Sequence, residues 1–501
     1  MDRESGGVGV RVSATQRRGQ LIGVGSRSRV VRRNASRRSV TTAASRAQTE
    51  SVIDWNAVRQ ETLGHLSSLI RIDTSNPPGN EKPAVDYLRE QLDSAGVETT
   101  VLEMDPQRPN LVARIRGDSS KGPLLLLTHL DVVPAAGTWS HEPFGGEIVD
   151  GFVWGRGSVD MKHIVAANLT TLLLAVRMRL PLKRDLIFAA TADEESAGES
   201  GAGWLFRKHR ELVACEVAIS EGGDALRYGG ETYLLIEAAE KGWLTVDLTR
   251  RSPSGHSSIP TTENCLLELG RILARLEKRR FPHRATPVAR ALIEGLADRQ
   301  PEHERQKTRD LLDPSRFADA ITSLDADDSI KRRFEGMLHS HATPTLLAGG
   351  ESTWAIPGTA RLTLAGRTLP GDTLESWLAQ LEEIVGPLGE HSISDFDPGV
   401  EIGDGEFFET LRRTVQRHNP EAHVLPTLML GGGDVRHAAF AGAAAYGFFP
   451  LSLDGSPSIW ELAHGQDERI SLRNAELCTR YAWDVLCLEN DAEEWLSPPM
   501  K

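Results

Sequence analysis

The sequence predicts an α/β fold in which a mainly parallel sheet has helices on both faces and carries a smaller inserted α+β domain. Two observations lead to this prediction. Short apolar strands alternate with helical segments from residue 55 to residue 240 and again after residue 398, as in a parallel sheet with crossover helices. Between these two stretches the strands have one polar face and the helices are amphipathic, which indicates a second unit with its own small core.

Length and composition limit the architecture and the partners. The chain has 501 residues, 40% hydrophobic and 25% charged, which favours a globular protein of two domains. Its 70 acidic residues outnumber the 57 Lys and Arg and give a net charge of -13. This charge argues against nucleic acid or an anionic membrane as a partner. Four cysteines without metal-knuckle or redox spacing fit a reducing cytoplasm, and no apolar run has the length of a membrane span.

Residues 1–50 differ from the rest of the chain. They are rich in Arg, Ser and Gly, and nearly free of acids between Gly6 and Gln48. The apolar stretch of a secretory signal is missing. An organelle transit peptide, a disordered basic tail and a misassigned start codon all fit this composition, so we leave these residues out of the fold.

The elements expected in the main domain follow from apolar spacing. Its first part covers residues 51–240 and its second part residues 399–490, followed by a tail over residues 491–501. Helical spacing predicts helices over residues 56–72, 82–95, 164–178, 407–418 and 471–488. Apolar or alternating runs of strand length predict strands over residues 99–103, 111–116, 124–128, 186–191, 217–220, 423–430 and 444–449.

The inserted domain is expected over residues 241–398. Alternation predicts strands over residues 244–250 and 361–367, and amphipathic spacing predicts helices over residues 263–278 and 373–385. The polar, charge-rich stretch over residues 281–348 is expected to form further helices and loops.

Potential metal ligands directly follow three apolar strands. They are His129 and Asp131 after the first, Glu194 and Glu195 after the second, and Glu221 after the third. Side chains at the carboxyl ends of neighbouring strands can converge, and imidazole together with carboxylate suits zinc. Each motif alone has an ordinary interpretation as a surface pair, a helix start or a turn. Their common placement after apolar strands favours a metal site.

The sequence resembles the di-zinc hydrolases that include aminoacylase, carboxypeptidase G, acetylornithine deacetylase, succinyl-diaminopimelate desuccinylase and several di- and tripeptidases. The resemblance spans about residues 55–488 and rests on motifs in family order. These motifs are THLDVVP at residues 128–134, GRGSVDMK at 155–162, the Glu194–Glu195 pair, EGG at 221–223, GHSS at 255–258 and HGQDE at 464–468.

The resemblance implies a centre with two zinc ions per chain. Asp160 would bridge the ions. His129 and Glu221 would complete one metal, and Glu195 and His464 the other. Cobalt or manganese would suit the same ligands.

The resemblance also implies roles for three groups beside the metals. Glu194 would take a proton from the metal-bound water and pass it to the leaving nitrogen. Asp131 would orient His129. The Asp160–Met161 peptide is expected to be cis.

The inserted domain is expected to act as a lid of the dimerisation type. His256 resembles the histidine that polarises the scissile carbonyl, from the same chain or from a dimer partner. Arg367 resembles the arginine that binds a substrate carboxylate, and Arg436 matches a second arginine near the site. The chain departs from the family at Trp354, where an Asn is usual, and at Gly433, where a Thr is usual. Both departures concern substrate recognition.

The implied function is the hydrolysis of an amide bond in a small peptide or an N-acyl amino acid. Dipeptidase or carboxypeptidase activity ranks ahead of deacylase activity. The competing hypothesis is a catalytically silent relative that acts as a metal-binding or scaffold protein, although such proteins usually lose ligands or the general base. A cytoplasmic enzyme, as a monomer or a homodimer, is expected, with organelle targeting by residues 1–50 left open.

Overall fold

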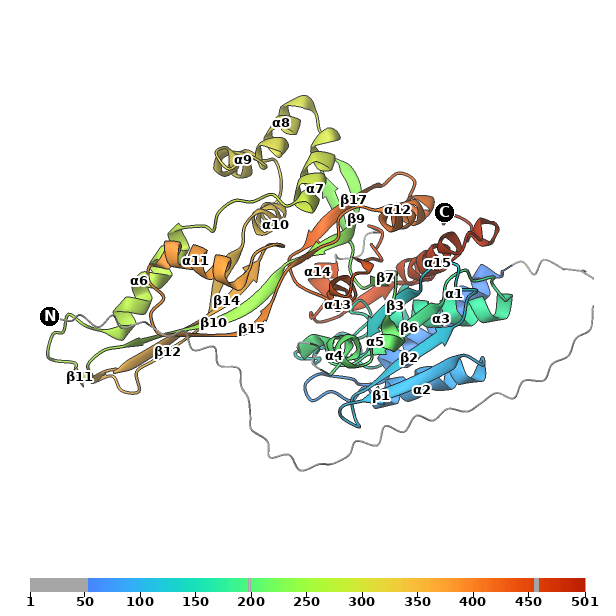
Figure 1. Cartoon of the computed structure of the whole chain (residues 1–501), viewed down its shortest axis with the longest axis horizontal. Helices are drawn as coiled ribbons and strands as arrows, with labels where there is room; N and C mark the ends of the chain where they lie inside the picture. The colour runs from blue at the N-terminus through green and yellow to red at the C-terminus, as the bar shows by residue number, and fades with distance from the viewer. Residues whose placement is uncertain (1–52, 197, 199, 455–458, 501) are drawn as a thin grey trace, which may run out of the picture. The chain divides into compact units, whose positions relative to one another are not determined.

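The computed structural model describes residues 53–196, 198, 200–454 and 459–500, so the predicted basic tail lies outside the described residues. The described chain forms two compact units (Figure 1). The main unit comprises the described residues up to Ala238, Ile402–Thr427 and the chain from Gly433 onward. The inserted unit comprises Ala239–Glu401 and Leu428–Gly432.

The main unit is built on one large sheet. Its strands lie in the order β1-β2-β6-β3-β7-β18-β9, and β6, β3, β7 and β18 run parallel to one another. β1, β2 and β9 add antiparallel strands at the two sides, and β8 pairs with β9. The prediction of a mainly parallel sheet is therefore confirmed for its centre. The bounds are β1 Glu98–Glu103, β2 Pro109–Ile115, β3 Leu124–His129, β6 Leu186–Thr191, β7 Val217–Ser220, β8 Asp224–Tyr228, β9 Glu231–Glu240 and β18 Ala444–Gly447.

Helices cover both faces of this sheet. All side chains of β3 and β6 are buried, because alternate residues face opposite helical layers. On one face Leu125 and Leu127 pack in a core with α4, α5 and α13. On the other face α3 packs on β3 and β6 and contacts α1, α2 and α15. The bounds are α1 Trp55–Ile70, α2 Lys82–Ser94, α3 Lys162–Met178, α4 Ala202–Lys208, α5 Arg210–Val213, α12 Glu406–His418, α13 Val435–Phe440 and α15 Leu472–Glu489.

Smaller elements complete the main unit. A three-stranded sheet has the order β19-β5-β4. The predicted tail is held by hydrogen bonds: the Trp483 indole donates to the Trp495 carbonyl at 2.8 Å, and Ser497 N–H donates to Asp484 at 2.7 Å. Within the described residues, no helix has the length and apolarity of a membrane span. The bounds are β4 Ile148–Val149, β5 Phe152–Trp154, β19 Arg469–Ser471, α14 Ile459–Leu462, and the 3-10 turns Glu194–Ser196 and Glu493–Trp495.

The inserted unit has a four-stranded antiparallel sheet in the order β12-β14-β10-β15. α6 and α11 bury their apolar sides against this sheet, around Trp377. The remaining helices, α7 to α10, fill most of the polar stretch. The bounds are β10 Gly242–Arg251, β12 His341–Gly349, β14 Thr359–Thr368, β15 His391–Asp397, α6 Cys265–Lys278, α7 Pro287–Asp298, α8 Glu302–Asp310, α9 Phe317–Ser323, α10 Asp328–Leu338 and α11 Leu374–Val385.

Short pairings link further strands, and one prediction fails. β11 pairs with β13, and β16 pairs with the end of β9 at Ala239 and Glu240. Residues 281–348 were expected to form only helices and loops, which is wrong from His341 onward, where β12 begins. Most side chains of β12 are exposed, so the strand lacks the apolar alternation that reveals a half-buried strand. The bounds are β11 Gly255–His256, β13 Ala355–Ile356, β16 Val400–Glu401 and β17 His423–Met429.

Candidate metal centre

The carboxyl ends of three neighbouring parallel strands bring the candidate ligands together. β6, β3 and β7 lie side by side in the sheet. His129 is the last residue of β3, and Glu221 directly follows β7. Glu194 and Glu195 begin the 3-10 turn after β6. Because parallel strands end at the same edge, these side chains share one region of the main unit.

The two oxygens of Asp160 face two different histidine–carboxylate pairs. His129 Nε2 lies 3.2 Å from Asp160 Oδ1 and 3.3 Å from Glu221 Oε1. His464 Nε2 lies 3.1 Å from Asp160 Oδ2 and 3.2 Å from Glu195 Oε2. All five expected ligands are thus in contact, with Asp160 between the two pairs. The Asp160–Met161 peptide is cis, as expected.

The charges of this cluster suit a bound cation. Burial raises the pKa of Glu221 to about 7, against the opposing effect of His129. Hydrogen bonds to Asp160 and Glu195 raise the pKa of His464 to about 10. The second oxygen of Glu195, Oε1, is buried without a hydrogen-bond partner. A buried acceptor of this kind is costly unless a cation or donor meets it.

The ligand atoms are also close enough to share ions. One atom from each of His129, Asp160 and Glu195 lies within 4.8 Å of the others, and the same holds for His129, Glu194 and Glu221. Mixed imidazole and carboxylate donors suit zinc, and manganese or cobalt also accept them. The residues present therefore fit a two-metal centre.

Asp131 contacts both the histidine and the acidic turn. His129 Nδ1 lies 3.0 Å from the backbone carbonyl oxygen of Asp131 and 3.6 Å from its carboxylate Oδ1. The two carboxylate oxygens instead accept the backbone N–H groups of Glu194 and Glu195, each at 3.1 Å. Asn76 donates to the same carboxylate at 2.8 Å. The Asp131 backbone thus orients the imidazole, and its side chain holds the turn.

Glu194 lies in a strongly acidic environment. Burial raises its pKa well above the ordinary range; His129 opposes this rise, and Glu221 and Asp434 add to it. The Asp434 carboxylate accepts a hydrogen bond from Thr191 at 3.1 Å, and burial raises its pKa to about 6. A carboxyl group with a raised pKa is a stronger proton acceptor than an ordinary carboxylate.

Arg156 and Glu468 fix the backbone at Asp160, a role that the sequence did not reveal. Glu468 Oε1 accepts the backbone N–H groups of Val159 at 2.8 Å and Asp160 at 3.2 Å. Arg156 Nη1 lies 2.5 Å from the other oxygen of Glu468, and both side chains are buried. The place of Glu468 in the HGQDE motif was the available signal, but 312 residues separate it from Arg156.

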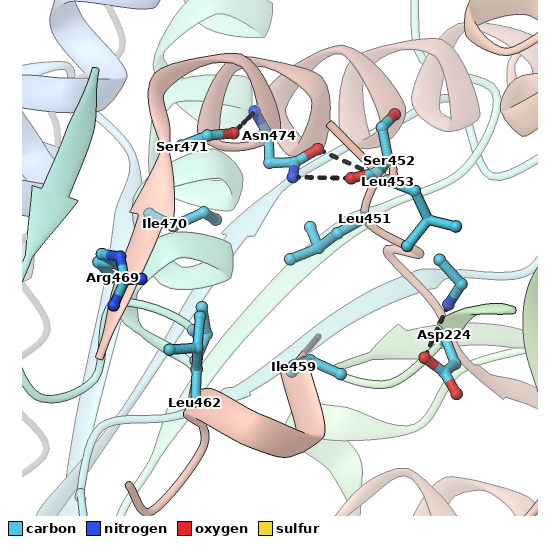
Figure 2. Close-up of a pocket in the computed structure, with 13 residues that line it drawn as sticks. Asp224, Leu451, Ser452, Leu453, Ile459, Leu462, Arg469, Ile470, Ser471 and Asn474 are labelled. Atoms are coloured by element: carbon cyan, nitrogen blue, oxygen red, sulfur yellow. Dashed lines mark hydrogen bonds between the residues drawn. The ribbon is translucent and has the colours of Figure 1, made fainter. Parts of the chain in front are cut away.

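A small cavity lies in the main unit (Figure 2). Its accessible volume is about 30 Å³, far below that of a pocket for a small molecule. Val159 and Leu462, which line it, are one and two residues from Asp160 and His464. The Asn474 side chain bonds both backbone groups of Ser452 at its wall. Most lining side chains are apolar, among them Ala225, Leu451, Leu453, Ile459 and Ile470.

Two of the predicted site residues, His256 and Arg367, belong to the inserted unit. His256 is exposed on β11 in the inserted unit, with Nδ1 2.8 Å from Ser258 Oγ. Arg367 lies on β14 of the same unit, its guanidinium carbon 5.9 Å from the centre of the Trp243 ring. Trp354, one of the two departures, is 73% exposed.

Arg436 lies in the main unit, close to Asp434, and is not one of the clustered candidate ligands. It is buried on α13, and its Nη1 donates to the carbonyl of Gly433, the other departure, at 2.6 Å. Its charge lowers the pKa of Asp434, against the larger effect of burial.

Comparison with known proteins gives consistent matches. The model of Peptidase family M20/M25/M40 matches residues 125–486. The N-fatty-acyl-amino acid synthase/hydrolase PM20D1.1 of Danio rerio is 28% identical over 381 residues, which cover 73% of this chain and 72% of that protein.

Two solved structures share the fold. The M20 family metallo-carboxypeptidase Sso-CP2 of Sulfolobus solfataricus has a TM-score of 0.63 at 20% identity, over 86% of this chain and 99% of that one. The YXEP protein of Bacillus subtilis, a dinuclear metal-binding peptidase of the M20 family, has a TM-score of 0.57 at 13% identity, over 87% and 98% of the two chains. At these identities the likeness describes the fold alone.

Proposed function

The chain belongs to Peptidase family M20/M25/M40, and from this premise we propose that it is a zinc-dependent enzyme that hydrolyses the amide bond of an N-acyl amino acid. One observation carries the proposal. The two oxygens of Asp160 face two separate histidine–carboxylate pairs, each at 3.1–3.3 Å. A bridging carboxylate between two such pairs is the donor arrangement of a two-metal hydrolase.

Five residues would hold the metals. His129 and Glu221, which are in contact, would hold one ion, Glu195 and His464 the other, and Asp160 would contribute to both. When bound, the two ions lower the pKa of a shared water and polarise the scissile carbonyl. The ligands are fixed in advance by their neighbours, since Asp131 holds Glu195 and Glu468 holds Asp160 through backbone N–H groups.

Glu194 is the proposed general base. Its backbone N–H is held by Asp131, and its carboxylate lies in reach of His129 and Glu221. It accepts a proton from the attacking water and delivers it to the leaving nitrogen. Its neighbour Glu195 faces His464 at 3.2 Å and serves as a ligand. Two adjacent acids therefore have separate tasks.

One observation favours an N-acyl amino acid over a peptide, which reverses the order expected from the sequence. A relative with 73% coverage of this chain carries the name N-fatty-acyl-amino acid synthase/hydrolase. A small peptide is the second candidate, supported by the match to the model of a peptidase family.

The inserted unit supplies two further candidate residues. Arg367 would bind the substrate carboxylate through its planar guanidinium, and His256 would stabilise the oxyanion. Arg436 is a weaker candidate, because it is buried and its Nη1 bonds the Gly433 carbonyl.

Metal analysis combined with a substrate panel tests the proposed function. The purified protein is expected to carry up to two zinc ions per chain and to lose activity to a chelator. N-acyl amino acids with apolar acyl groups should be cleaved faster than dipeptides that share the same carboxyl-terminal residue. Full activity of metal-free protein would reject the two-metal mechanism, and faster cleavage of dipeptides would reject the acyl preference. A catalytically silent relative would bind metal and cleave neither class.

A further inference from the structure

The turn that carries Glu194 and Glu195 is fixed at its start by Asp193. This residue has a φ of +70°, a left-handed conformation that a non-glycine residue adopts only when its surroundings hold it there. Asp193 Oδ1 accepts hydrogen bonds from Arg108 Nη1 at 2.8 Å and Asn76 Nδ2 at 3.3 Å. Its Oδ2 accepts the backbone N–H of Ser200 at 3.0 Å.

The Arg108 guanidinium also pairs with a second buried acid, Glu81. Arg108 Nη2 donates to Glu81 Oε1 at 2.7 Å, and Nε lies 3.2 Å from both Glu81 oxygens. The Glu81 side chain is fully buried and the Arg108 side chain is 13% exposed. Gly79 allows this approach, because a Cβ there would lie 2.2 Å from Arg108 Nε.

Asn76 joins this ion pair to the acid that holds the turn. Its side-chain amide donates to Asp193 and also to Asp131, at 3.3 and 2.8 Å. Asp131 in turn accepts the backbone N–H groups of Glu194 and Glu195. A continuous set of hydrogen bonds therefore runs from Glu81 and Arg108 to the backbone of both acids.

We propose that Arg108 is a positioning residue of the metal centre: held by Glu81, it fixes Asp193 and so the turn that presents Glu194 and Glu195. Buried ion pairs of this kind contribute little net stability, whereas a fixed turn is needed by two adjacent acids with different tasks. Arg108 meets neither metal nor substrate in this role. The inference rests on the proposed roles of Glu194 and Glu195.

Arg114 offers a matched control. It lies six residues further along the chain, on β2, and its Nη1 pairs with Asp185 Oδ2 at 3.3 Å. Its side chain is 17% exposed, close to the 13% of Arg108. Arg108→Met and Arg114→Met each remove one largely buried guanidinium from an aspartate, but only the first aspartate belongs to the turn.

The test measures zinc affinity and local backbone exchange, so it does not depend on turnover. Zinc titration of metal-free Arg108→Met should give about 10–100-fold weaker binding, the usual scale for a lost residue behind the ligands. Amide hydrogen exchange of a peptide containing residues 193–195 should be faster in this variant. Arg108→Lys should recover part of the affinity, because an ammonium can still pair with one of the two acids. Arg114→Met should leave zinc affinity and exchange of that peptide unchanged.

Equal changes in the two methionine variants would overturn the proposal, because they would reflect general loss of stability. Unchanged zinc affinity in both would overturn it as well. If Arg108→Met does not fold, Arg108→Lys and Asp193→Asn provide the same comparison. A wild-type protein that binds zinc but cleaves no amide would reject the proposed function, while the exchange comparison would still decide whether Arg108 fixes the turn.

Discussion

The carboxylate of Asp131 accepts the backbone N–H of Glu194 at 3.1 Å and lies beyond hydrogen-bond range of the His129 imidazole, at 3.6 Å. The Asp131 side chain therefore stabilises the acidic turn. The histidine is held by the Asp131 backbone, whose carbonyl oxygen meets His129 Nδ1. Because a charged acceptor strengthens backbone hydrogen bonds, the negative charge of Asp131 fixes the proposed general base Glu194 and the proposed ligand Glu195 together.

Asp131→Asn should reduce both turnover and zinc affinity by about 10–100-fold each. An amide has one acceptor oxygen and one donor nitrogen, so it can accept only one of the two N–H groups of Glu194 and Glu195. Steady-state kinetics and zinc titration give the two values. Loss of turnover with unchanged zinc affinity would show that Asp131 does not hold the Glu195 side of the turn.

Glu194→Gln and Glu195→Gln should differ in metal content. The first should keep both metals and lower turnover by at least ~100-fold, the scale of a lost general base. The second should lose metal, because Glu195 Oε2 faces His464 at 3.2 Å. Elemental analysis beside kcat separates the variants, with circular dichroism as the control for folding. Identical metal contents would refute the division of tasks between the two acids.

The strand ends were predictable from sequence because His129, the Glu194–Glu195 pair and Glu221 come just after apolar runs. The β3 and β6 cores are continuous buried segments, so His129 and Glu194 fall at the same sheet edge. The pairing of His464 with Glu195 is not visible in any local pattern, and only the family resemblance supplied it. Arg156 with Glu468 and Arg108 with Glu81 escaped prediction, since the partners meet only in the folded chain.

In the inserted unit, hydropathy reveals some strands of the sheet and misses another. β10 and β14 bury one face in the Trp377 core, so alternate apolar residues reveal them. β12 pairs along β14 through backbone hydrogen bonds while its side chains remain exposed. Backbone pairing leaves no trace in hydropathy, and a strand of this kind can be found only through its partner.

Lys241 should make the stability of the inserted unit depend on pH. Its Nζ donates to the Gly336 and His339 carbonyls at 2.8 and 2.6 Å, and the side chain is buried. Burial, with Arg367 nearby, lowers its pKa from 10.5 to about 7. Between these two values the unfolded chain binds more protons than the folded chain, so the free energy of unfolding should rise with pH across this window.

Chemical unfolding of wild type and Lys241→Met at pH 7 and at pH 10 measures this effect. The free energy of unfolding of the wild type minus that of Lys241→Met should be larger at pH 10 than at pH 7. Only the wild type gains stability over this range, because its lysine releases a proton on folding. Titrations elsewhere in the chain cancel in this difference. A difference that is the same at both pH values would show that Lys241 has an ordinary pKa in the folded protein.

His256 should be required for turnover without being required for metal binding. It lies in the inserted unit, whereas all five proposed ligands lie in the main unit. His256→Ala is therefore expected to keep both metals and to lose most of kcat, as for a lost oxyanion donor, about 10²–10³-fold. Ser258→Ala, which removes only the hydroxyl beside His256 Nδ1, is the matched control and should have a smaller effect.

Subunit mixing decides which chain supplies His256. In a symmetric dimer with shared sites, inactive Glu194→Gln and inactive His256→Ala proteins should regain part of the activity after exchange. Each heterodimer would then contain one site with both residues intact. Differently tagged subunits, purified through both tags, establish that exchange has occurred. Purified heterodimers without recovered activity, or a strictly monomeric active enzyme, would refute the shared site, because His256 would then serve the metals of its own chain.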